Sequence, residues 1–153
     1  MASAGTENER RRAKLAEYLS RHGLKKTRQR EAIMEAFLAK EGHVTSEELY
    51  KRVRARNPEI GAATVYRTLK LLCDAGIANA IHFRDGITLY ERQQSHHDHL
   101  ICLSCGEVIE FESAAIEKRQ LAIAKKYGYR LTRHRHHLFG YCPACQKKDL
   151  AKS

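Results

Sequence analysis

Two Cys-x-x-Cys pairs, Cys102/Cys105 and Cys142/Cys145, constrain the fold of the C-terminal half more than any other feature of the sequence. Two such pairs bring four thiolates close enough to bind one zinc ion tetrahedrally, with Zn–S distances of about 2.3 Å. Each pair ends a stretch that we expect to be extended, so the metal would hold together the two ends of a small sheet. Four protein ligands leave no open position. The spacing therefore predicts structural Zn(II), with a redox dithiol as the alternative.

The chain length fits one ordinary domain or two small ones. Each of two small domains would need metal or dimerisation to be stable. The chain has 153 residues, of which 42% are hydrophobic and 30% charged. No stretch approaches the roughly 20 apolar residues that a membrane helix needs, and the N-terminus lacks the apolar region of a signal peptide. We therefore expect a cytoplasmic protein without membrane contact, in which the cysteines stay reduced and available to metals.

Positive charge is concentrated near the N-terminus. The formal net charge is +10, and nine lysines and arginines lie between Arg10 and Arg30 against one acidic residue, Glu17. A basic stretch of this kind attracts the phosphate backbone of nucleic acid. The alternative is a helix face that is simply solvated, and charge alone does not decide between the two.

The N-terminal half shows helical spacing of apolar residues, followed by two short extended stretches around Asp85-Gly86, a strong hairpin pattern. We expect four helices: one over about 9–22, one that begins after its cap Thr27, one that runs from its cap Thr45 to Asn57-Pro58, and one over 61–72. We expect two strands, over 77–83 and 87–92. Their buried faces are expected to hold Ala13, Ala16 and Leu19 (widened by Leu15 and Tyr18), then Ile33, Met34, Phe37 and Leu38, then Val65, Leu69 and Leu72. Short helices followed by a hairpin predict a winged helix-turn-helix.

The helix over 61–72 is the candidate for reading DNA. Thr64, Tyr66, Arg67 and Lys70 point largely away from its apolar stripe. Small residues at the start of a helix let it sit deep in a groove, where Tyr and Arg reach phosphates and base edges. Two alternatives remain open at this point: a helical domain with a solvated basic face, and a winged helix that binds protein.

The run His96-His97-Asp98-His99 predicts metal binding in the C-terminal half. In an extended strand side chains alternate, so His97 and His99 share one face while His96 and Asp98 share the other. One run can thus serve two metal sites. Further ligands would be Glu110 from a strand over 107–111, Glu117 from a helix over about 113–127, and His134 from a strand over 129–136. His136 shares the face of His134, but we expect a ligand role there less than a surface role.

Three strings, GAATVYRTLKLL, HHDHLICLSCGEVIEF and GYCPAC, resemble the ferric uptake regulator (Fur) family, and the likeness runs from about Gly23 to Cys145. The resemblance implies an α+β fold: a winged-helix DNA-binding domain over 1–92, with 1–22 as an N-terminal helix region, and a small α/β dimerisation domain with structural zinc over 93–153. It also implies a homodimer on double-stranded operator DNA. Pairing of dimers into tetramers stays open.

The resemblance carries three metal sites and a DNA surface onto this chain. The structural zinc site, called the tetrathiolate site below, comprises Cys102, Cys105, Cys142 and Cys145. The regulatory site comprises His43, Glu91, His97, His99 and Glu110. The additional site comprises His96, Asp98, Glu117 and His134. The DNA-binding residues are Tyr66 and Arg67 at the major groove and Lys25 at the minor groove, joined by Thr64 from the helix pattern.

Nitrogen and oxygen ligands without thiolate suit Fe(II) or Mn(II), although Zn(II) would also bind. Zinc sensors of the family usually carry a sensory cysteine, and peroxide sensors tend to have Asp where this chain has Glu91 and Glu110. We therefore expect an iron-responsive repressor of iron-uptake genes and not an enzyme. The alternatives are a peroxide-sensing or a manganese- or zinc-sensing regulator of the same family. From other classes, a zinc-dependent hydrolase and a zinc-ribbon protein-interaction module also compete.

Overall fold

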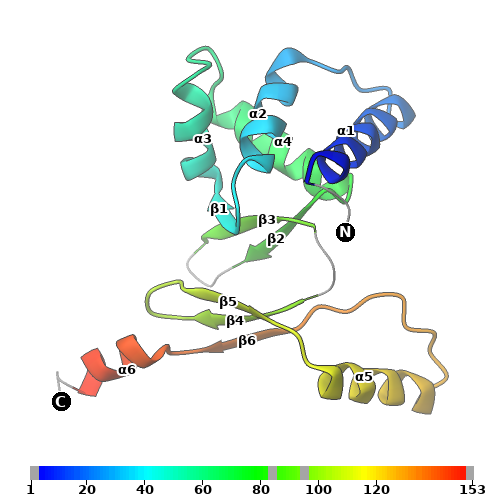
Figure 1. The fold of residues 1–153 in the computed structure, drawn as a ribbon, viewed down its shortest axis with the longest axis vertical. Helices are drawn as coiled ribbons and strands as arrows, with labels where there is room; N and C mark the ends of the chain where they lie inside the picture. The colour runs from blue at the N-terminus through cyan, green and yellow to red at the C-terminus, as the bar shows by residue number, and fades with distance from the viewer. Residues whose placement is uncertain (1–3, 83–85, 94–96, 151–153) are drawn as a thin grey trace. The chain divides into compact units, whose positions relative to one another are not determined.

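The structure is a computed structural model that describes residues 4–82, 86–93 and 97–150 (Figure 1). The chain divides into two compact units, an N-terminal unit over 1–93 and a C-terminal unit over 94–153. Helices and small antiparallel or mixed sheets make up both, which confirms the predicted α+β class. No helix among the described residues is long and apolar enough to cross a membrane.

The N-terminal unit is a winged helix-turn-helix, as predicted. Its elements are α1 (Ala4–Arg21), α2 (Arg28–Leu38), β1 (His43–Thr45), α3 (Ser46–Arg54), α4 (Ala62–Asp74), β2 (Ala78–His82) and β3 (Thr88–Arg92). The strands form an antiparallel sheet in the order β1-β3-β2. The short strand β1 was not foreseen, because three residues between two helices are too few for an alternating pattern. Asp85 of the expected hairpin turn lies outside the described residues, while Gly86 has a φ of 75°.

The helices of this unit enclose one apolar core. Val65, Leu69 and Leu72 of α4 are fully buried, and the predicted residues of α2 are also buried. The prediction for α1 was partly wrong, because Ala13 and Ala16 are exposed and the buried residues are Leu15 and Leu19. The face that α1 buries is therefore a narrow stripe of residues four apart, and the small alanines lie beside it.

Polar contacts fix α1 onto the rest of the unit. Arg12 makes two hydrogen bonds of 2.7 and 2.8 Å to the Glu35 carboxylate on α2. Arg11 donates to the backbone oxygen of Gln93 at 2.9 Å, and Lys14 donates to that of Gly76 at 2.7 Å. Several charged side chains of the basic N-terminal run thus hold α1 against the rest of the unit.

Helix α3 begins with the predicted capping box. The Thr45 hydroxyl accepts from Glu48 N at 3.1 Å, and the Glu48 carboxylate accepts from Thr45 N at 2.9 Å. These two bonds satisfy donors that the first turn of a helix otherwise leaves without partners.

Replacing Thr45 by Ala is therefore expected to lower the free energy of unfolding by about 1 kcal/mol. Urea unfolding of the zinc-loaded chain, followed by far-UV circular dichroism, measures this change. Ser46→Ala, one position inside the helix, is the matched control and should leave the unfolding midpoint nearly unchanged. Equal midpoints for Thr45→Ala and the wild type would refute the role given to the cap.

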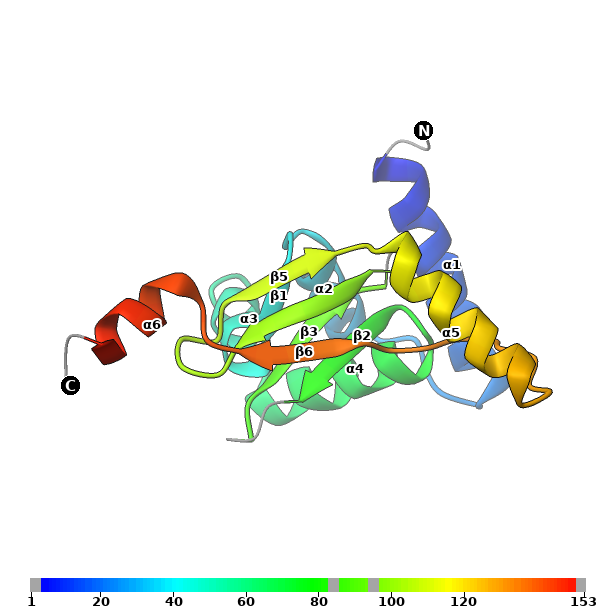
Figure 2. The ribbon, with the colours of Figure 1, turned by 90° about the horizontal axis from the view of Figure 1, so that it is seen from below.

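The C-terminal unit is built on a three-stranded sheet. Its elements are β4 (Asp98–Cys102), β5 (Val108–Phe111), α5 (Ala114–Lys126), β6 (His137–Gly140) and α6 (Pro143–Leu150). Strand β4 lies between β5, which is antiparallel to it, and β6, which is parallel to it (Figure 2). The final helix, α6, was not predicted.

The strand predicted over 129–136 was wrong, because strand β6 covers His137–Gly140 instead. The register explains the shift: His137 lies opposite His99 and Gly140 opposite Cys102, so pairing with β4 takes up the residues just before the second cysteine pair. The stretch 129–136 is mostly exposed and connects α5 to the sheet. Its two apolar residues, Tyr129 and Leu131, are both exposed.

Few apolar residues of the C-terminal unit are buried. Ile101 is fully buried, whereas α5 has no buried residue. Leu100, Ile109 and Leu138 are register partners that form one row across the three strands, and they are 42%, 49% and 42% exposed. A unit of this size with so small a core needs a metal or a partner for stability.

Candidate metal centres and nucleic-acid interface

The tetrathiolate site lies where the ends of β4 and β6 meet the segments that follow them. Cys102 ends β4, Cys105 lies in the β4–β5 connection, Cys142 follows β6, and Cys145 lies in the first turn of α6. All four sulfur atoms lie within 4.8 Å of one another. The Cys105 and Cys142 sulfurs are 3.7 Å apart. Sulfurs bound 2.3 Å from one tetrahedral zinc are about 3.8 Å apart, so the cysteines are already spaced for the ion.

Backbone groups prepare the Cys102 thiol for metal. Hydrogen bonding from the backbone of Cys105 and of Cys142 lowers the pKa of Cys102 to about 6, which favours the thiolate at neutral pH. The bond from Cys142 N to Cys102 Sγ measures 3.3 Å and joins the two pairs directly. The residues present therefore fit Zn(II), which would supply the cross-link that the small core lacks.

A second group of potential ligands also lies in the C-terminal unit. Asp98 on β4, Glu117 in the first turn of α5 and His134 have ligand atoms within 4.8 Å of one another. His134 Nε2 lies 3.1 Å from Glu117 Oε1, and Asp98 is 1% exposed. Three of the four residues predicted for the additional site are thus close together. The fourth, His96, lies outside the described residues.

The residues predicted for the regulatory site fall into two groups, one in each unit. In the N-terminal unit, His43 and Glu91 are register partners on β1 and β3, with His43 Nε2 2.9 Å from Glu91 Oε2. In the C-terminal unit, His99 and Glu110 are register partners on β4 and β5, and the His97 and His99 rings lie 4.8 Å apart. Each group offers a metal both imidazole nitrogen and carboxylate oxygen.

The buried Glu91 carboxylate has a further partner that sequence reasoning missed. Glu91 is 2% exposed, and Asn79 on β2 donates to its Oε1 at 3.3 Å. Asn79 and Glu91 are register partners, so Glu91 lies between His43 and Asn79 on the middle strand. Finding Asn79 from sequence would have required the hairpin register, which the Asp85-Gly86 turn hinted at but did not define.

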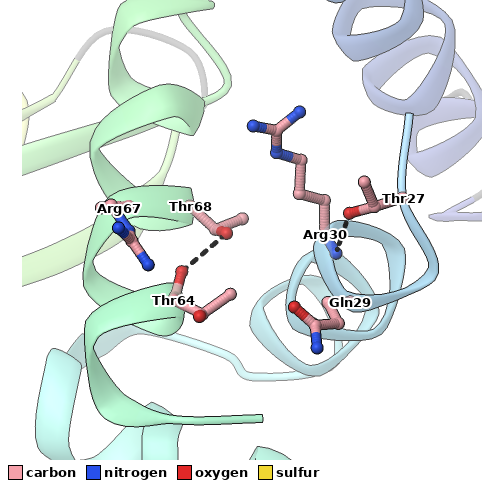
Figure 3. A pocket seen from close by; sticks show the side chains of 6 residues that line it. All are labelled: Thr27, Gln29, Arg30, Thr64, Arg67 and Thr68. Atoms are coloured by element: carbon pink, nitrogen blue, oxygen red, sulfur yellow. Dashed lines mark hydrogen bonds between the residues drawn. The ribbon is translucent and has the colours of Figure 1, made fainter. Parts of the chain in front are cut away.

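The predicted DNA-binding residues lie on accessible surface. Tyr66 and Arg67 on α4 and Lys25 before α2 are exposed, and Thr64 is partly buried. A polar hollow of about 320 Å³ lies between the start of α2 and α4 (Figure 3). Two of the predicted residues, Thr64 and Arg67, line it. The rest of its lining was not predicted to bind DNA: Thr27, Gln29, Arg30 and Thr68.

Ion pairs change the interpretation of the basic run. Arg10 pairs with Glu7, Arg21 with Glu17, and Lys26 with Glu31, at distances of 3.8, 2.7 and 2.7 Å. Such pairs reduce the charge that α1 and the segment after it present to a polyanion. The basic run therefore presents less charge than its lysines and arginines alone would indicate, and the exposed side chains of α4 remain candidates for DNA contact.

Comparison with known proteins agrees with this arrangement. Residues 21–139 match the model of the ferric uptake regulator family. The chain is 49% identical over 126 residues to the ferric uptake regulation protein of Escherichia coli K12, which covers 81% of this chain and 85% of the relative. This chain belongs to the ferric uptake regulator family. Members of the Fur family are metal-dependent transcriptional regulators, not enzymes; they bind DNA and are dimeric.

Two solved Fur-family structures resemble this one. The Helicobacter pylori ferric uptake regulator, described as having three functional metal-binding sites, superposes with a TM-score of 0.81 at 31% identity, covering 91% of this chain and 93% of its own. A zinc-bound manganese uptake regulator superposes with a TM-score of 0.60 at 44% identity, covering 84% and 98%. Membership of the family is therefore shown. The similar structures include one regulator named for iron and one named for manganese.

Proposed function

We propose that this chain is an iron-responsive repressor that binds operator DNA as a homodimer when Fe(II) occupies the regulatory site. The observation that carries the proposal is the pair of ligand groups, His43/Glu91 in one unit and His97, His99 and Glu110 in the other. Their nitrogen and oxygen donors suit Fe(II) or Mn(II), and none of them is a thiolate. The tetrathiolate site holds Zn(II) and keeps the C-terminal unit folded.

The regulation follows from ligands that belong to both units. A metal ion that takes ligands from both restricts the angle between them, and in a dimer that angle determines the spacing of the two α4 helices. The metal must bind the DNA-competent arrangement more tightly than the others, since equal affinity would shift nothing. A coupling free energy of about 1–3 kcal/mol corresponds to roughly a 5–150-fold change in DNA affinity.

The apolar row on the sheet supports the homodimer. Leu100, Ile109 and Leu138 lie side by side on three neighbouring strands and are each about half exposed. Exposed apolar residues gathered in this way are typical of a protein–protein interface, and a second copy of the chain offers the same apolar surface in return.

A manganese-responsive regulator is the second candidate, because a relative at 44% identity is named a manganese uptake regulator. Fe(II) and Mn(II) accept the same ligand types, so the choice depends on affinity and on metal availability. Anaerobic titration of the zinc-loaded chain with each metal, at a fixed concentration of DNA, separates the two candidates. Half-maximal DNA binding at a lower free concentration of Mn(II) than of Fe(II) would favour manganese.

A gel shift on an AT-rich palindromic duplex tests the proposed function itself. The zinc-loaded chain should bind in Mn(II) or anaerobic Fe(II), and it should release the DNA on mild chelation while keeping one zinc ion per chain. Absence of DNA binding under every metal condition would overturn the proposal and leave a zinc-dependent interaction module.

Arg67→Ala is expected to weaken DNA binding by about 1–3 kcal/mol, because the exposed guanidinium on α4 is placed to reach bases or phosphates. Fluorescence anisotropy of a labelled duplex measures the dissociation constant at fixed salt. The matched control is Arg52→Ala, which removes the same charge from an exposed position on α3. Equal losses in the two variants would mean that α4 is not the reading helix.

A further inference from the structure

His136 lies beside the predicted additional site without belonging to its ligand group. Its Nδ1 is 3.7 Å from Oδ2 of Asp98, and its backbone oxygen accepts from His99 N at 3.2 Å. The next residue, His137, is the register partner of His99, with ring centroids 5.3 Å apart. Side-chain alternation therefore places His136 on the Asp98 side of the sheet and His137 on the His99 side.

The surroundings of Asp98 give His136 a defined position. Asp98 lies on the middle strand with Phe111 as its register partner on β5, and His136 approaches it from the opposite side, just before β6. The Phe111 and His136 rings lie 6.4 Å apart in an edge-on arrangement. The Asp98 side chain is 1% exposed and that of His136 is 30% exposed, so the imidazole lies at the solvent edge of the buried carboxylate.

We propose that His136 is a positioning residue for metal at the additional site, where it donates a hydrogen bond from Nδ1 to the Asp98 carboxylate. The inference rests on the proposed additional site of Asp98, Glu117 and His134. A carboxylate that binds a metal with one oxygen is oriented by a donor on the other, and loss of such a donor typically weakens metal binding by about 10–100-fold. Closing the distance from 3.7 Å to hydrogen-bond length requires a movement of about 1 Å.

The geometry favours positioning over direct ligation. The ligand atoms of Asp98, Glu117 and His134 lie within 4.8 Å of one another, and the described members of that group do not include His136. His136 contacts the group through Asp98. Metal bound by the three residues would therefore keep its ligand set when the imidazole is removed, while the carboxylate would lose this donor.

Cobalt(II) titration of the full-length, zinc-loaded chain tests the proposal. The parent protein carries His97→Ala and Glu110→Ala, so that regulatory-site binding does not contribute to the absorption bands. In this parent, His136→Leu should weaken Co(II) binding about 10–100-fold while the band positions at saturation stay the same. His136→Asn should restore most of the affinity, because its amide can donate to the same oxygen. Arg135→Gln, an exposed neighbour, is the matched control and should bind as the parent does.

Three results would overturn the proposal, and one of them would also overturn the additional site itself. Unchanged affinity in His136→Leu, with Asp98→Ala abolishing binding, would leave the additional site standing but remove His136 from it. Shifted band positions in His136→Leu and His136→Asn would make His136 a ligand. Co(II) binding that persists in Asp98→Ala would mean that the additional site itself is wrong. Zinc content and circular dichroism of each variant establish that the fold is retained.

Discussion

Cys102→Ser is expected to remove the zinc ion from the tetrathiolate site and to unfold much of the C-terminal unit. Cys102 is buried at the end of β4, and its sulfur accepts from Cys142 N at 3.3 Å, so the change breaks the link between the two cysteine pairs. Structural zinc contributes an apparent free energy of about 10–16 kcal/mol in zinc-finger peptides. Because this unit buries few apolar residues, we expect loss of most of its ordered structure and of the dimer.

Metal analysis and thermal unfolding measure this effect. The variant should contain no zinc at the tetrathiolate site, and its unfolding midpoint should fall by more than about 10 °C. Cys73→Ser is the matched control, since Cys73 is a partly buried residue of α4 in the other unit, and it should keep one zinc ion per chain. A zinc-free Cys102→Ser protein that unfolds at the wild-type temperature would show that the cross-link is dispensable.

His99→Ala is expected to abolish most of the metal dependence of DNA binding while leaving the fold and the zinc intact. His99 is buried on β4, opposite Glu110 and beside His97. Loss of its imidazole nitrogen removes one of five proposed ligands to the regulatory metal. With metal present, DNA affinity should fall roughly 5–150-fold, towards the value of the metal-free wild type.

Anisotropy titrations with and without Mn(II) measure both states of the variant. The control is His22→Ala, because His22 is an exposed histidine at the end of α1 that stacks on Tyr18. It should retain the full metal response. A His99→Ala protein that still needs metal for DNA binding, with wild-type affinity, would exclude His99 from the regulatory site.

The fold could be predicted wherever local sequence and packing agree. The predicted apolar stripe of α4 is buried, with Val65, Leu69 and Leu72 in the core. The predicted capping box of Thr45 and Glu48 is also present. The failures occurred where tertiary pairing overrides pattern. The residue pattern of 129–136 predicted a strand, but the residues that pair with β4 are 137–140. Likewise, Ala13 and Ala16 have helical spacing, yet a narrow contact on α1 leaves them exposed.

The candidate sites could be predicted best where their residues lie close together in the sequence. The two cysteine pairs and the His-x-His pattern are short motifs whose ligand chemistry can be deduced directly, and the structure brings the four cysteines together. The contacts of Asn79 with Glu91 and of His136 with Asp98 depend on strand register. Register is a long-range property, so these two residues could not be assigned from the sequence.

The central claim is that metal binding and DNA binding stabilise the same arrangement of the chain. Reciprocal linkage tests it most directly: the affinity of the zinc-loaded protein for Mn(II) is measured by competition with a chelator, with and without the operator-like duplex. Linkage requires DNA to tighten metal binding by the same factor by which metal tightens DNA binding, which we expect to be about 5–150-fold. An Mn(II) affinity that is the same with and without DNA would contradict the account.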